Sequence, residues 1–232
     1  MLRRPLSVSM NRRQIIAGLI YLPFYLIFLS LAIELLLRWL FRDAVTQAML
    51  NICFYAVNTV IVLLLFGPFL RENFAHTEWK TVFRKLPKAL LVYFGVSIAV
   101  NSVVFLLQPE FANQNNDAIL GILQDSPVFV FFLTVVLAPL IEETIFRGLI
   151  FGNLLRVSRL LAYAVTALGF AGIHVISYIG SLTLPDLLLS ILQYIPAAVV
   201  LCAVYEKRDT IAAPMLLHGC INLIACLAMG AM

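Results

Sequence analysis

The sequence is poor in charge. Only 12% of its 232 residues are Asp, Glu, Lys or Arg, while 62% are hydrophobic and the mean hydropathy is +1.00. A soluble domain carries about 25% charged residues. This scarcity excludes a soluble globular domain and predicts an all-α, polytopic membrane protein built as a bundle of helices.

Cysteine motifs and zinc-protease motifs are also missing. The four cysteines lie in apolar runs without CxxC or paired extracellular spacing, which indicates buried free thiols. No His-Glu-x-x-His pair is present. The net charge of +4 comes from Lys and Arg in short loops beside apolar runs, a pattern typical of topology signals and lipid-headgroup contacts. We therefore expect lipid, and not nucleic acid, as a partner.

Apolar runs of about 20 residues are long enough to cross a membrane as helices. The sequence contains about seven of them, and we expect a single membrane domain. The predicted spans are residues 15–37, 48–70, 89–107, 128–155, 160–179, 186–205 and 211–229.

Basic residues are concentrated in alternate loops. They lie before residue 15, within 71–88, at Arg156 and Arg159, and at Lys207 and Arg208. Residues 108–127 and 180–185 contain none, and the loop after the first span has only Arg38 and Arg42. Because positive loops stay inside, the pattern predicts a cytoplasmic N-terminus and an external C-terminus. Termini on opposite sides of the membrane also support an odd number of spans.

The basic loop 71–88 has a pattern of its own. From Trp79, apolar residues recur at i, i+3, i+4 and i+7, while Lys80, Arg84 and Lys85 occupy the opposite face. This spacing predicts a basic amphipathic helix lying on the inner membrane surface.

Two adjacent carboxylates and an arginine interrupt the fourth apolar run. Glu143 and Arg147 are four residues apart, so they share a helix face and can form an ion pair. Glu142 lies ~100° away around the helix and is left over. Ionisable groups at membrane depth are costly and usually functional. A buried, unpaired carboxylate suits a general base or a proton carrier.

Two later spans carry the other polar candidates. Span five ends its apolar run in Phe170-Ala171-Gly172-Ile173-His174, and span seven contains His218-Gly219-Cys220-Ile221-Asn222. At ~1.5 Å per residue, Glu142, His174 and Asn222 each lie ~20–22 Å from the inner end of their spans, and His218 ~14 Å. Taken alone, His174 would be interpreted as a packing residue. The shared depth instead favours one polar site.

The order Glu-Glu-x-x-x-Arg, Phe-x-x-x-His, His-x-x-x-Asn on successive membrane helices resembles the CAAX-protease and bacteriocin-processing family. This family, also called Abi, includes the type II CAAX prenyl endopeptidases. The resemblance covers about residues 118–227, and every motif position is filled. We expect 118–227 to form the protease core and 1–110 to wall its cavity within the same membrane domain.

The resemblance implies an intramembrane endopeptidase that hydrolyses a peptide bond in a membrane-associated protein or small peptide. Glu142 would activate water together with His174, while His218 and Asn222 would stabilise the oxyanion. The site would be supported by Glu143, Arg147 and Phe170. The short chain with small loops indicates a bacterial plasma membrane.

Alternatives remain open on these residues. A non-catalytic immunity or scaffolding protein could share the fold, and a proton-coupled transporter could use Glu142 and His174 as a relay. No inverted repeat is visible that would favour the transporter. One Glu and two His could hold zinc with an open fourth position. Since asparagine is a poor zinc ligand, we expect no cofactor, with zinc as the alternative.

Overall fold

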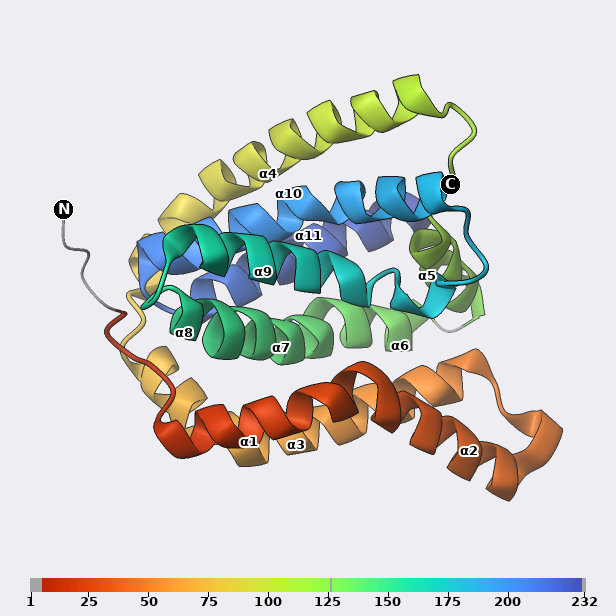
Figure 1. Ribbon diagram of the computed structural model, residues 1–232, viewed down its shortest axis with the longest axis horizontal. Helices are drawn as coiled ribbons and strands as arrows, with labels where there is room; N and C mark the ends of the chain where they lie inside the picture. The colour runs from red at the N-terminus through yellow and green to blue at the C-terminus, as the bar shows by residue number, and fades with distance from the viewer. Residues whose placement is uncertain (1–5, 126, 231–232) are drawn as a thin grey trace.

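All regular structure in the described part of the chain is helical (Figure 1). The computed structural model describes residues 6–125 and 127–230. Five segments are long and apolar enough to span a membrane: Arg12–Ala44, Gln47–Ala75, Trp79–Leu107, Leu184–Arg208 and Ala212–Gly230. Side chains such as Leu64 (76%) and Leu106 (79%) are largely exposed, as expected of lipid-facing helices. The predicted all-α membrane bundle is confirmed, whereas the number seven is not.

The first two spans form a hairpin along one side of the bundle (Figure 1). The first span begins at the Asn11 capping box with Gln14, and Thr46 caps the second. Pro23 cannot donate a backbone hydrogen bond, and the helix continues past it as a short π segment. The hairpin packs against the fourth span. Its elements are α1 (Arg12–Pro23), η1 (Phe24–Phe28), α2 (Leu29–Phe41), η2 (Arg42–Ala44) and α3 (Gln47–Ala75).

The third span, α4, runs from Trp79 to Leu107 without interruption. The prediction of a separate basic surface helix is wrong, because its residues form the first turns of α4. Pro87 lies inside the helix, a position that membrane helices tolerate. At 29 residues α4 is ~43 Å long, which exceeds the ~30 Å hydrocarbon core. Its basic start can therefore extend beyond the lipid while its apolar end crosses it.

The fourth span is a rod of alternating α and π turns, preceded by α5 (Gln114–Asp125). Two π segments flank α7, the turn that carries Glu142 and Glu143. Such π turns inside helices are frequent at functional sites. The rod consists of α6 (Pro127–Phe132), η3 (Leu133–Leu137), α7 (Ala138–Glu143), η4 (Thr144–Phe151) and α8 (Gly152–Leu154).

The fifth span ends earlier than predicted. α9 covers Arg159–Ile173, and a short 3-10 turn, η5, follows at Ile176–Tyr178, where the sequence predicted helix to 179. His174 lies at this end of the helix. Its ring Nδ1 lies 2.8 Å from the Phe170 carbonyl, while its backbone N–H bonds to the carbonyl of Ala171. The side chain of His174 is thus held at the point where the chain leaves the helix.

The last two spans complete the bundle. α10 (Leu184–Arg208) packs against α9, α4, η4 and α11 (Ala212–Gly230). The turn between them has Asp209 in a left-handed conformation and is held by the side chain of Asn73, which accepts from the Ile211 N–H at 3.1 Å. The α3–α4, α8–α9 and α10–α11 turns meet at one end of the bundle (Figure 1). These turns and the helix turns beside them contain Lys80, Arg156, Arg159, Lys207 and Arg208. Which side of the membrane that end faces stays a prediction.

Candidate active site

Glu143 and Arg147 form the predicted ion pair, and both are fully buried. Nη1 of Arg147 lies 2.9 Å from Oε1 of Glu143, and each side chain is 0% exposed. The guanidinium also donates to the carbonyl of Ala198 on α10 (3.1 Å) and lies 4.4 Å from the centre of the Phe170 ring on α9. Arg147 therefore joins the fourth span to α9 and α10.

Glu143 has a second partner that the sequence did not predict. Nδ1 of His218, on α11, lies 2.8 Å from the same Oε1 atom that Arg147 contacts. An ionised carboxylate only accepts, so Nδ1 is the donor. This bond fixes the ring and turns Nε2 toward Glu142, whose Oε2 lies 3.9 Å away.

Glu142 is buried, with 6% exposure, and its Oε2 has no hydrogen-bond partner among the described residues. The 3.9 Å separation from His218 is too long for a direct hydrogen bond. Two polar atoms at this distance can share one water or one substrate atom. Because an unsatisfied buried oxygen is costly, the arrangement favours a ligand at this point.

Phe170 is the ring around which the motifs gather. Its centroid is 4.9 Å from that of His174 and 5.7 Å from that of His218, and Arg147 lies over its face. His174 and His218 also interact electrostatically. The carbonyl that His174 contacts through Nδ1 can only accept, so Nδ1 carries the proton and the neutral ring keeps its lone pair at Nε2.

Asn222 lies one helical turn after His218 on α11. Its amide donates to the carbonyl of Thr134 in η3 (2.7 Å), which leaves a second amide hydrogen. The two segments approach closely at Gly219, where a Cβ atom would lie 2.7 Å from the carbonyl oxygen of Val135. Glycine is therefore needed between the two donor residues.

The structure brings five of the seven predicted residues into direct contact, through Glu143 and through the ring of Phe170. The other two are Glu142, whose carboxylate faces His218, and Asn222, which lies on the same helix as His218. Thr134, Tyr194 and Ala198, which contact this set, were not predicted. A backbone carbonyl and a tyrosine in an apolar run carry no pattern that could have indicated them.

Comparison with known proteins agrees with this geometry. The family described as "Type II CAAX prenyl endopeptidase Rce1-like" matches residues 124–224, the part of the chain that carries all seven residues. Residues 124–224 are thus similar to the CAAX-protease and bacteriocin-processing family that the motifs resemble. The residues of the three motifs thus lie on three helices that meet around Phe170.

A curated relative supports the same similarity. The "UPF0177 protein in abiGi 5'region" of Lactococcus lactis subsp. cremoris is 33% identical over 95 residues, which cover 40% of this chain and 36% of that protein. The chain thus matches only about a third of the length of this relative. No solved structure matches the chain.

A zinc site would need several ligating side chains close together, and the described residues do not provide such a group. Within residues 6–125 and 127–230, no group of three or more His, Cys, Asp or Glu is close enough to hold a metal ion. The described donor set therefore does not fit a three-ligand zinc site.

Proposed function

We propose that this membrane protein is an intramembrane endopeptidase that hydrolyses a peptide bond in a membrane-associated protein or small peptide. The observation that carries the proposal is the partnerless oxygen of Glu142, buried 3.9 Å from His218 Nε2. The family similarity supports a protease, and the geometry supports a specific division of labour among its residues.

Glu142 acts as the general base. Its free Oε2 takes a proton from a bound water, the water oxygen attacks the carbonyl carbon of the scissile bond, and the same carboxyl later returns the proton to the leaving amine. His174 presents an unprotonated Nε2, which can accept the second hydrogen bond of that water and orient it.

His218 and Asn222 stabilise the oxyanion. Two carboxylates and one guanidinium leave the cluster with one excess negative charge, which a protonated His218 balances. Nε2–H of this imidazolium and the second amide hydrogen of Asn222 are then the two donors for the tetrahedral intermediate. Glu143 orients His218 and also pairs with Arg147, so its role extends beyond holding the helix.

The N-terminal hairpin walls the site. Helix α3 contacts α7, the turn that carries Glu142, and α1 contacts η4. A water-poor surround strengthens each interaction with the developing charge. We propose that the membrane is that of a bacterial cell and that the partners are membrane lipid and a membrane-associated protein or peptide substrate.

The test is peptide cleavage by purified protein in liposomes, with fluorogenic peptides with and without a prenylated C-terminal cysteine. Glu142→Gln and His174→Ala should each lower the cleavage rate about 10²- to 10⁴-fold, the usual range for proton transfer by a positioned side chain. Glu34→Gln is the matched control, because Glu34 is a half-exposed glutamate paired with Arg38 on the first span.

Undiminished cleavage by Glu142→Gln would contradict the mechanism. If the wild-type protein cleaves no peptide yet protects cells against a bacteriocin, the non-catalytic immunity protein would be the better interpretation. A chelator is added in a parallel arm. We expect no loss of rate, and loss that zinc restores would show that a metal takes part.

A further inference from the structure

His174 is held by a second side chain outside the family motifs. The ring of Tyr194, on α10, stacks on the imidazole with centroids 4.2 Å apart and planes inclined by 23°. We infer that Tyr194 is a positioning residue that fixes the plane of His174 and thereby aims its Nε2. The inference rests on the proposed function, in which that nitrogen orients the attacking water.

The need for such a residue follows from the place of His174. It lies at the end of α9, where the chain leaves the helix, and the described restraints on the ring from its own segment come from Phe170, through the bond from Nδ1 to its carbonyl and a tilted ring contact at 4.9 Å. One hydrogen bond fixes one atom but allows the ring to rock about it. Stacking against a second face removes that freedom. A reactive group has to be held within about 0.5 Å and 10–20° of its working geometry.

Tyr194 is itself anchored at its hydroxyl. The hydroxyl donates to Oδ1 of Asn113 (3.3 Å), which precedes α5. Asn113 donates through Nδ2 to Oε1 of Gln193 (2.6 Å), and Gln193 donates through Nε2 to Oδ1 of Asn101 (2.8 Å) on α4. Each amide donates through nitrogen and accepts through oxygen, so the chain of bonds is internally consistent. It ties the ring that faces His174 to α4 and to the segment before α5.

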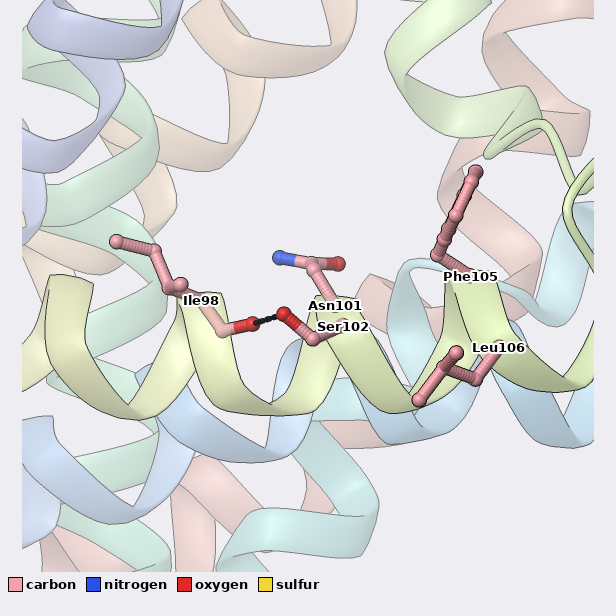
Figure 2. Close-up of a pocket in the computed structure, with 5 residues that line it drawn as sticks. All are labelled: Ile98, Asn101, Ser102, Phe105 and Leu106. Atoms are coloured by element: carbon pink, nitrogen blue, oxygen red, sulfur yellow. Dashed lines mark hydrogen bonds between the residues drawn. The ribbon is translucent and has the colours of Figure 1, made fainter.

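The far end of this chain lies in a shallow pocket of about 470 Å³ on α4, lined by Ile98, Asn101, Ser102, Phe105 and Leu106 (Figure 2). The amide of Asn101 points away from its helix there, whereas the hydroxyl of Ser102 bonds back to the carbonyl of Ile98 (Figure 2). The two polar residues of this pocket therefore differ in their hydrogen bonds, since Asn101 bonds to Gln193 and Ser102 bonds within its own helix.

The inference is tested by NMR of protein with labelled histidine. The chain has three histidines, so the signals are assigned by replacing each in turn. A proton above an aromatic face is shifted upfield by the ring current. Tyr194→Leu should therefore move the His174 ring signals downfield, while Tyr194→Phe, which keeps the ring, should leave them close to the wild-type positions.

Tyr178→Leu is the matched control. The hydroxyl of Tyr178 also reaches the start of α5, at the carbonyl of Gln114 (3.3 Å), but its ring makes no described stack with His174. Its variant should leave the His174 signals in place. In the cleavage assay, Tyr194→Leu should be about two- to tenfold slower, as expected from the loss of one aromatic pair. Tyr194→Phe should recover most of that rate.

A second arm avoids disturbing the helix packing. Asn113→Ala with Asn115→Ala removes both side-chain partners of the Tyr194 hydroxyl from outside the spans, and Asn101→Ala removes the far anchor, with Ser102→Ala as its control. The double variant and Asn101→Ala should broaden or shift the His174 signals, and Ser102→Ala should not.

The inference is overturned if the His174 signals stay in place in Tyr194→Leu and in the double variant of Asn113 and Asn115, or move equally in Tyr178→Leu. The NMR result does not depend on cleavage. A wild-type protein without protease activity would thus refute the proposed function and leave the positioning of His174 to be decided by its signals.

Discussion

The effect of burial on the ion pair of Glu143 and Arg147 can be tested, because the first span contains a second Glu–Arg pair. Glu34 and Arg38 have the same spacing and the same 2.9 Å separation, but their side chains are 42% and 55% exposed, whereas Glu143 and Arg147 are 0% exposed. Burial is thus the variable that distinguishes the two pairs. Removing one partner of a buried pair leaves an uncompensated charge, at a cost of roughly 3–5 kcal/mol, while an exposed pair contributes about 0–1 kcal/mol.

We therefore expect Glu143→Gln and Arg147→Met each to destabilise the protein by roughly 3–5 kcal/mol. The double variant should lose less than the sum, because it buries no unpaired charge. The equivalent changes at Glu34 and Arg38 should be almost neutral and additive. The double variant should nevertheless be inactive, since His218 has lost the carboxylate that orients it.

The assay is thermal unfolding in detergent, followed by a thiol-reactive dye that reacts when the buried Cys202 and Cys226 become exposed. For a chain of this length, 1 kcal/mol corresponds to about 2–4 °C, so each single variant should unfold at least ~6 °C earlier. Equal effects at the buried and the exposed pair, or additive losses in the buried double variant, would refute the reasoning.

Two further predictions concern packing and topology. Gly219→Ala should lower the unfolding temperature and abolish most cleavage, because its Cβ would lie 2.7 Å from the backbone oxygen of Val135; Gly95→Ala, with no atom within 4 Å, is the control for the same assays. A reporter fused after Met232 should be accessible only from outside the cell and one fused before Met1 only from inside, as the basic loops predict; the reverse pattern would show the orientation prediction to be wrong.

The site could be predicted in outline because its chemistry depends on rare residues. Glu142, Glu143 and Arg147 stand out in an uncharged run, and the spacing of four between Glu143 and Arg147 was enough to predict their ion pair. The second partner of Glu143 was not predictable. Which carboxylate meets His218 depends on the rotation of α11 about its own axis, which is set by the close contact at Gly219.

The fold could be predicted at the level of membrane helices and less well at their ends. Apolar runs defined α3, α10 and α11 to within a few residues of most ends. They could not show that the basic segment from Trp79 and the apolar run after Pro87 form one helix, since proline usually ends a helix but is tolerated inside membrane helices. Nor could they show that α9 ends at Ile173 and leaves His174 at the end of the helix.

The π segment η4 affects which faces of the fourth span meet α11 and the N-terminal hairpin. A π turn is equivalent to one extra residue in an α-helix, so the residues beyond it are rotated by ~100° relative to a regular helix. Before the segment, Glu143 faces His218 on α11; within it, Gly148 faces Met10 and Phe69 on the opposite, N-terminal side. The rod thus presents different faces to α11 and to the hairpin. A length change of one residue between Glu143 and Gly148 would therefore turn the carboxylates relative to the hairpin.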